Sequence, residues 1–418
     1  MLLYNAFLRL YSIGIKMISL WNPKARRWVE GRKDLFIKLN HFRLKTTNKK
    51  KVWVHCASLG EYEQGLPVLE KIKAAYPDYI MVLSFFSPSG YEAVKNRNSA
   101  DEIFYLPMDN ALNAKRFLDA IEPSLVIWIK YEYWYYYLTE LKQRNIPVLL
   151  VSGIFRKSQP FFKWYGNVWK KMLGCFDHLF VQSQESATLL SGIDISGNIS
   201  VSGDTRFDRV IEIAETAGPD LPAHIAEFCA GSKIIVAGST WPEDEEELDH
   251  YANKHREIKF IIAPHEIDDA HLKEIEKLFH HTLRYSAFDI NRDMGANVLI
   301  IDNIGLLSRL YKCADITYVG GGFGADGIHN VLEPAVYGKP VVFGPEYEKY
   351  LEAEELLETG GGISIDNALE LEMLLDELIM DENKLMEAGT ASKKYVYSRA
   401  GASQQILDYI QVKRLLIS

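Results

Sequence analysis

Residues 51–86 read KVWVHCASLGEYEQGLPVLEKIKAAYPDYIMVLSFF, and this stretch decides the fold class. Two short and almost continuous apolar runs, 51–57 and 79–86, enclose an amphipathic segment over 62–76. A strand buried on both faces has such an uninterrupted run, and a helix between two strands is the crossover of a parallel sheet. The stretch therefore predicts a βαβ unit of an α/β fold.

The same alternation continues along the chain in two series. Further strands are predicted at 124–129, 146–151 and 178–183, and then at 233–238, 258–263, 297–301, 315–320 and 339–344. Between the series, residues 209–231 are acidic and have no strand signal, and Pro219 and Pro222 lie in their middle, which is typical of an interdomain connection. We therefore predict two Rossmann-like domains that face a central cleft.

The predicted boundaries follow from this pattern. They are 1–33 for a membrane-associating segment, 34–210 for an N-terminal domain, 211–231 for a linker, 232–395 for a C-terminal domain, and 396–418 for a C-terminal helix that packs back on the N-terminal domain.

Composition excludes several other classes of protein. The 418 residues are 48% hydrophobic and 25% charged, which is typical of folded domains and not of disordered or fibrous chains. The four cysteines form no Cys-x-x-Cys pair, which argues against a disulfide framework and a cysteine zinc site. Residues 1–51 carry a net charge of +11 within a chain of −9, so the basic charge is local. We interpret it as contact with an anionic membrane surface rather than with nucleic acid.

The first 21 residues, MLLYNAFLRLYSIGIKMISLW, predict a helix that lies in the membrane interface. The polar members fall at spacings of four, three, four and three residues, so they form one stripe of a helix: Asn5, Arg9, Ser12, Lys16 and Ser19. We expect Arg9 and Lys16 of this stripe to face the headgroups and the apolar sides to enter the acyl boundary. A membrane-spanning anchor and a helix packed on the protein's own core remain as alternatives, whereas no cleavage site of a signal peptide follows.

Ligands of open parallel sheets bind beyond the carboxyl ends of the strands, so candidate functional residues are expected directly after each strand. After the first strand, Gly60 permits a tight turn, and Glu61 is placed to act as a general base. Ser58 and Glu61 also have the S-x-x-E spacing of a capping box, which is a purely structural alternative.

The loop GGGFGADGIHN, residues 320–330, contains five glycines before a helix. Its N–H groups are available to an anion, although a flexible turn has the same composition. Glu333 is placed to accept ribose hydroxyls, and His265, which follows the strand at 258–263, to reach a phosphate. The G-x-G-x-x-G spacing of Gly322, Gly324 and Gly327 is a weak dinucleotide signal, because this loop does not follow the first strand of its domain. No ligand spacing indicates a metal.

Several segments together resemble one family, the 3-deoxy-D-manno-octulosonic acid (Kdo) transferases of lipopolysaccharide synthesis. They occur in the same order along nearly the whole chain: HCASLGEYEQGLPVLE (55–70), FFSPSGYE (85–92), YLPMDN (105–110), GDTRFD (203–208), GSTWPEDEEE (238–247) and GGGFGADGIHNVLEPAVYGKPVVFGP (320–345). The resemblance implies a GT-B glycosyltransferase that moves Kdo from CMP-Kdo to a lipid A precursor. It implies an inverting reaction without a metal or other cofactor, at the cytoplasmic face of the inner membrane.

The resemblance also assigns roles to individual residues. It implies that Glu61 is the general base and that Glu132 is a second catalytic carboxylate. The residues implied in CMP binding are His265, Gly322, Gly327, His329, Asn330 and Glu333. Those implied in acceptor binding are Ser58, Gly60 and Arg206.

The chain departs from the family pattern at several of these elements. Lys130 stands where the first glutamate of an E-x-E element is expected, Trp241 where a histidine is expected, and Glu346 where another histidine is expected. Two alternatives therefore stay open: a GT-B enzyme that uses a nucleotide-diphosphate hexose, and a membrane-peripheral nucleotide-binding protein without catalysis.

Overall fold

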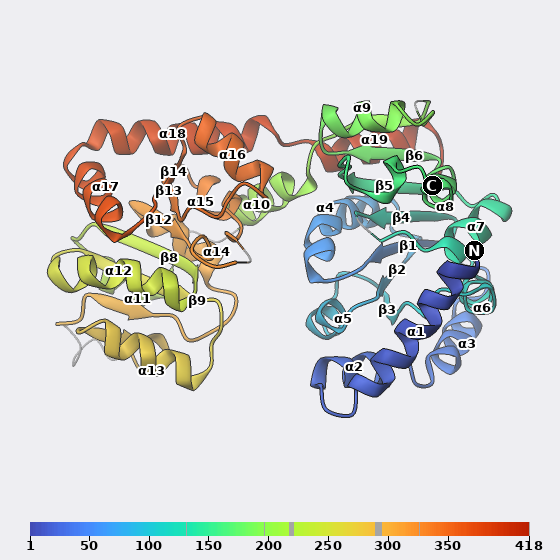
Figure 1. The fold of residues 1–418 in the computed structure, drawn as a ribbon, viewed down its shortest axis with the longest axis horizontal. Coiled ribbons are helices and arrows are strands. Elements are labelled where there is room, and N and C mark those ends of the chain that lie inside the picture. The colour runs from blue at the N-terminus through green and yellow to red at the C-terminus, as the bar shows by residue number, and fades with distance from the viewer. Residues whose placement is uncertain (131, 196, 217–220, 289–294, 326, 418) are drawn as a thin grey trace. The chain divides into compact units, whose positions relative to one another are not determined.

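Each half of the chain builds a parallel sheet from the apolar runs, and helices cover both faces of each sheet (Figure 1). The computed structural model describes residues 1–130, 132–195, 197–216, 221–288, 295–325 and 327–417. The chain divides into two compact units, unit 1 with Met1–Arg209 and Ala400–Ser418, and unit 2 with Val210–Arg399. The prediction of an α/β fold with two parallel sheets is confirmed.

The sheet of unit 1 has the strand order β3-β2-β1-β4-β5-β6-β7. Its strands are β1 (Lys51–Cys56), β2 (Ile80–Phe85), β3 (Glu102–Tyr105), β4 (Leu125–Ile129), β5 (Val148–Gly153), β6 (His178–Val181) and β7 (Ile199–Val201). Side chains alternate between the two faces of β1. The core on the Trp53 face includes residues of α3 (Leu35–Lys45), α6 (Ala111–Ile121), α7 (Tyr135–Gln143), α8 (Asn167–Leu173) and α9 (Gln184–Ser191). The core on the face of Val52 and Val54 includes residues of α4 (Leu59–Ala75), α5 (Pro88–Val94) and α19 (Ala402–Val412).

The sheet of unit 2 has the order β10-β11-β9-β8-β12-β13-β14. Its strands are β8 (Ile234–Thr240), β9 (Lys259–Pro264), β10 (Thr282–Arg284), β11 (Val298–Ile300), β12 (Ile316–Val319), β13 (Val341–Phe343) and β14 (Gly362–Ser364). One face packs against α12 (Pro242–Lys254), α13 (Asp269–Leu278) and α17 (Ala368–Met380), and the other against α11 (Ala223–Cys229) and α14 (Leu307–Leu310). The remaining helices of unit 2 are α15 (Leu332–Ala335), α16 (Leu351–Glu358) and α18 (Glu382–Ser398).

Helix α10 (Thr205–Thr216) begins in unit 1 and continues into unit 2. Together with α11 it occupies part of the predicted linker, whose residues 217–220 lie outside the described residues. At the other end of unit 2, α19 returns to unit 1. There Ile406 and Ile410 join the apolar core beside α4.

Helix α1 (Leu2–Ile18) and α2 (Pro23–Glu30) form the N-terminal segment of unit 1. Tyr4 donates a hydrogen bond to Asp109 (2.6 Å), and the Tyr136 hydroxyl donates one to Asn5 (2.8 Å). Leu8 is buried on the same side of α1. Asn5, a member of the predicted polar stripe, therefore contacts the body of unit 1. The 3.6-residue period identifies a polar stripe but not its partner, and here the partner includes the protein's own Tyr136.

The opposite side of α1 and the turn after it expose large apolar side chains. They are Leu2, Leu3, Phe7, Leu10, Ile13, Met17, Ile18, Leu20 and Trp21. Arg9 and Lys16 are also exposed on this helix. Among the described residues no helix combines the length and the apolar character that crossing a bilayer requires.

Candidate functional site

The predicted site residues lie at the carboxyl ends of the strands in both units, and three backbone positions there are strained. Lys130 after β4, Ser152 in β5 and Ser239 in β8 have φ values of 58°, 54° and 56°. A positive φ is uncommon for residues other than glycine and is often found at functional sites. The pairing of β5 and of β8 with a neighbouring strand shifts register at the same points.

Glu61 lies in the first turn of α4, directly after β1. The backbone N–H of Ser58 donates to Glu61 Oε2 (3.0 Å), and the Ser58 hydroxyl bonds the same oxygen. The capping box is therefore present. Among the described residues no hydrogen-bond partner holds Oε1, so the carboxylate keeps one oxygen for another partner while it caps the helix.

Gly60 does not form the tight turn predicted for it. It is the second residue of α4, it has no positive φ, and it is exposed. A methyl group added there would meet only the Ser58 hydroxyl, at 3.9 Å. Ser58 is the N-cap, as the S-x-x-E spacing indicated, so Gly60 falls within the first turn of the helix.

Glu132 follows β4, which pairs with β1, so both predicted carboxylates follow neighbouring strands. The Trp134 indole donates to Glu132 Oε2 (3.0 Å), and His55 Nε2 lies 3.6 Å from the same oxygen. The Glu132 side chain is 26% exposed, whereas His55 is fully buried. Tyr131, within the same predicted element, lies outside the described residues.

The hydrogen bonds of Ser84 specify the tautomer of His55. The Trp53 indole donates to the Ser84 hydroxyl (2.8 Å), and that hydroxyl lies 2.9 Å from His55 Nδ1. Ser84 has no other bond in the described part of the chain, so its proton is directed to Nδ1. A neutral His55 then carries its own proton on Nε2, the nitrogen that faces Glu132.

Arg206, predicted to bind the acceptor, pairs with the buried carboxylate of Asp204, and its predicted role stays a prediction. The Arg206 guanidinium lies 2.7 and 2.8 Å from Asp204 Oδ2. Gln64 and Gln182 also donate to this carboxylate, which links α4, β6 and α10. Burial acts to raise the pKa of Asp204, but Arg206 outweighs it and lowers the pKa below its ordinary value.

In unit 2, three rings stack at the ends of β8, β9 and β12. The centroids of His265 and His329 are 4.4 Å apart, and those of Trp241 and His265 are 4.9 Å apart. The Trp241 indole N–H donates to His329 Nε2 (3.0 Å). A neutral His329 therefore has its proton on Nδ1. His265 is exposed, and the stack provides a flat surface that a nucleotide base or sugar can contact.

Asp244, near the start of α12, fixes the glycine loop to this stack. Its Oδ2 accepts from the backbone N–H of Gly321 (2.8 Å) and of Trp241 (2.9 Å), and Tyr318 donates to Oδ1 (2.8 Å). Burial raises the pKa of Asp244 to about 6, although these donors act in the opposite direction. The loop and the tryptophan therefore share one buried acceptor.

Close packing and backbone conformation require glycine at two positions of the loop, whether or not a ligand binds there. A methyl group on Gly322 would meet the backbone of Gly344 at 2.6 Å, and Gly327 has a φ of 83°. Asn330 donates to Glu333 Oε1 (3.1 Å) and accepts from the N–H of Leu332 (3.2 Å), so these residues form the start of α15. Asp326 lies outside the described residues. The roles predicted for Gly322, Gly327, Asn330 and Glu333 in CMP binding stay predictions.

Sequence reasoning missed three residues that organise these sites: His55, Asp204 and Asp244. Each was part of a quoted motif, and their burial as polar residues among apolar strands was the available signal. In the described part of the chain, no group of three or more His, Cys, Asp or Glu side chains is arranged to hold a metal ion.

Residues 33–209 match the family described as 3-deoxy-D-manno-octulosonic-acid transferase (kdotransferase). A 3-deoxy-D-manno-octulosonic acid transferase of Aquifex aeolicus is 28% identical over 79% of this chain and 86% of that protein. This chain is a glycosyltransferase related to the Kdo transferases. A bifunctional glycosyltransferase/methyltransferase of Fusobacterium nucleatum is 27% identical over 79% of this chain, which spans about half (53%) of that protein's length.

The fold also resembles that of solved structures of other proteins. The UDP-GlcNAc 2-epimerase of Neisseria meningitidis, solved bound to UDP-GlcNAc, matches with a TM-score of 0.61 and 16% identity over 86% of this chain and 99% of that one. At that identity the likeness concerns the fold alone. Of the site residues, Glu61, Glu132 and Arg206 lie inside the segment matched by the Kdo transferase family, and the ring stack of unit 2 lies outside it.

Proposed function

We propose that this glycosyltransferase moves Kdo from CMP-Kdo onto a lipid A precursor in lipopolysaccharide synthesis, with inversion at the transferred sugar and without a metal. Unit 1 binds the acceptor and unit 2 binds the donor. The similarity to the Kdo transferases supports the reaction class. The single observation that carries the assignment of residues is Glu61, whose carboxylate uses one oxygen as a helix cap and keeps the other open.

The proposed reaction is one displacement. Glu61 takes the proton from the acceptor hydroxyl, and the resulting oxygen nucleophile forms a bond to the anomeric carbon of Kdo. The bond from that carbon to the phosphate oxygen of CMP breaks on the opposite side, and CMP leaves with the electron pair. The Nδ1–H of His329 and the N–H groups of the loop 320–330 stabilise the departing phosphate. Because CMP carries a single phosphate, we propose that these donors stabilise its charge sufficiently without a metal ion.

Glu61→Gln tests the base. The glutamine oxygen still accepts from Ser58, so the free energy of unfolding changes by less than about 1 kcal/mol. The rate of transfer falls by roughly 10²–10⁴-fold, because glutamine cannot take the proton. The measurement is mass spectrometry of product formed from CMP-Kdo and a lipid A precursor.

Glu63→Gln is the matched control. Glu63 lies two residues further along α4 and pairs with Arg97 (3.3 Å) and Arg209 (3.5 Å). This variant should keep transfer within a few fold of the wild-type rate. Full activity of Glu61→Gln would contradict the assignment of Glu61 as the general base. Tighter binding of UDP than of CMP would contradict the assignment of CMP-Kdo as the donor.

We also propose that α1 binds the cytoplasmic face of an anionic inner membrane through its exposed apolar side. Phe7 and Leu10 are 61% and 68% exposed, and α1 is tied to unit 1 by the opposite side. Exposed apolar patches of this kind mark interaction surfaces. The basic residues Arg9, Lys16, Lys24 and Arg26 supply attraction to anionic headgroups.

A double variant, Phe7→Glu with Leu10→Glu, tests the membrane contact. It should abolish flotation with vesicles that contain anionic phospholipid while CMP binding is retained. The control is Leu369→Glu with Met373→Glu on α17, where the two side chains are 67% and 66% exposed and the added charge is the same. Equal loss of flotation in both variants, or in neither, contradicts the assignment to α1.

A further inference from the structure

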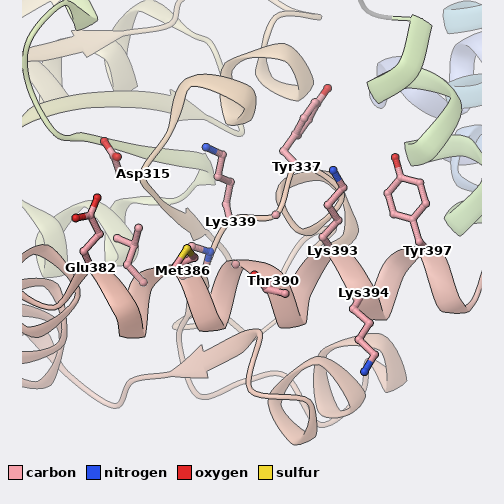
Figure 2. A pocket seen from close by; sticks show the side chains of 13 residues that line it. Asp315, Tyr337, Lys339, Glu382, Met386, Thr390, Lys393, Lys394 and Tyr397 are labelled. Carbon is pink, nitrogen blue, oxygen red and sulfur yellow. The ribbon is translucent and has the colours of Figure 1, made fainter.

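A pocket of about 800 Å³ lies in unit 2 beside one face of α18 (Figure 2). Asp315 and Lys339 line it; Asp315 directly precedes β12, and Lys339 lies two residues before β13. The pocket is therefore at the amino edge of the parallel sheet. The ring stack of Trp241, His265 and His329 follows the carboxyl ends of the strands, so the pocket is separate from the proposed donor site.

Lys339 and Lys393 form no ion pair among the described residues, although the carboxylates of Asp315 and Glu382 also line the pocket. Burial lowers the pKa of the Lys339 ammonium group. The nearby Asp315 carboxylate is already engaged, because it accepts from the N–H of Ile234 (2.8 Å) and lies 3.6 Å from Lys233. An ammonium group that is partly withdrawn from water without a counterion is unfavourable, so an anion would stabilise it.

A second lysine and two hydroxyl-bearing residues also line the pocket. Lys393 contacts the ring of Tyr397 (5.7 Å) and has no ion pair in the part of the chain that the structure describes. Figure 2 shows the amines of Lys339 and Lys393 on the same side of α18 and that of Lys394 on the other side. Thr390 lines the pocket, and the buried Tyr337 hydroxyl has no hydrogen-bond partner among the described residues.

We propose that this pocket binds a small phosphomonoester between Lys339 and Lys393. A phosphomonoester carries about −1.5 to −2 charge at neutral pH, which matches two ammonium groups better than a single carboxylate does. Its oxygens accept from the two ammonium groups. Leu385 and Met386 provide an apolar wall for the organic part. The site does not depend on the proposed transfer reaction.

The test follows the methyl signal of Met386 in the full chain labelled with ¹³C-methyl methionine. Inorganic phosphate is titrated at constant ionic strength against chloride. The Met386 signal should shift and saturate. Lys339→Gln and Lys393→Gln should each weaken phosphate binding by roughly tenfold, because each removes a charged hydrogen bond.

Lys277→Gln is the matched control, since it removes the same charge from an exposed position on α13 that does not line the pocket. It should leave the affinity within about twofold of wild type. Vesicles of phosphatidylcholine with and without phosphatidic acid distinguish the source of the phosphomonoester. A shift with phosphatidic acid alone identifies a lipid headgroup, and a shift with free phosphate identifies a soluble ligand. The proposal is overturned if no probe shifts Met386, or if Lys277→Gln weakens binding as much as the other two variants.

Discussion

The Trp241 indole N–H donates a hydrogen bond to His329 Nε2, although the two residues are 88 positions apart in the sequence. This bond favours the neutral tautomer of His329 with its proton on Nδ1. Trp241→Phe keeps an aromatic ring beside His265 but removes the indole N–H. His329 then loses its fixed tautomer, and its Nδ1–H is no longer held as a donor. We expect the Kd for CMP to rise by about three- to tenfold, which is the effect of one hydrogen bond.

Titration calorimetry with CMP measures this effect, and Trp241→Ala separates the hydrogen bond from the stack. Alanine removes both the N–H and the ring, so it should bind CMP more weakly than phenylalanine does. Wild-type affinity in Trp241→Phe would show that the N–H has no part in donor binding. Equal affinities in the two variants would assign the whole effect to the N–H.

Single residues could be predicted where the signal is local and not where the partner is distant in sequence. The S-x-x-E spacing of Ser58 and Glu61 predicted the capping box, and the structure contains it. The contact of His55 with Glu132 depends on the pairing of β1 with β4, which no local pattern specifies. The same holds for Asp204, whose partners come from α4, β6 and α10.

At the scale of elements, every strand that the sequence predicted is present, and the four that it missed are the four sheet edges: β3, β7, β10 and β14. Each edge strand has only three or four residues. An edge strand has one neighbour and is less buried, so it needs no long apolar run. β7 illustrates this, since none of its residues is buried. The central strands were predictable because burial on both faces dictates their composition.

The start of α12 is the element that connects the sheet of unit 2 to the glycine loop, through Asp244. Asp244→Ala leaves the N–H groups of Gly321 and Trp241 without their acceptor. We expect the free energy of unfolding of unit 2 to fall by roughly 2–4 kcal/mol, because buried donors lose their partner. CMP binding should weaken as well. Thermal unfolding and calorimetry measure the two effects.

Glu243→Ala is the control at the same helix end, because Glu243 is an exposed acid of the first turn. It should cost less than about 1 kcal/mol through the helix dipole. Comparable losses in Glu243→Ala and Asp244→Ala would mean that helix capping, and not the contact with the loop, is what Asp244 contributes.

At the scale of the whole molecule, each unit buries an aspartate whose pKa is raised: Asp109 in unit 1 and Asp244 in unit 2. Burial raises the pKa of each to about 6 from an ordinary value of 3.8. Between about pH 4 and pH 6 the folded chain therefore keeps protons on these carboxyl groups that the unfolded chain has released. Stability is therefore greatest below about pH 4 with respect to these groups, and it is lost as the pH rises through about 6. Each shift corresponds to at most about 3 kcal/mol.

Asp109 offers the cleaner measurement, because it joins α1 to the body of unit 1 through Tyr4 and because seven of the eight tryptophans lie in that unit. Urea unfolding followed by tryptophan fluorescence should give a free energy that declines between about pH 4 and pH 6. Asp109→Asn removes the titrating group and should flatten the decline, whereas the exposed Asp78→Asn should leave it unchanged. A decline of the same slope in Asp109→Asn would mean that the protonation of other groups governs the pH dependence of unit 1. A free energy that rises over this window in the wild type would mean that the hydrogen bonds donated by Tyr4, Tyr136 and Tyr137 outweigh the burial of the carboxylate.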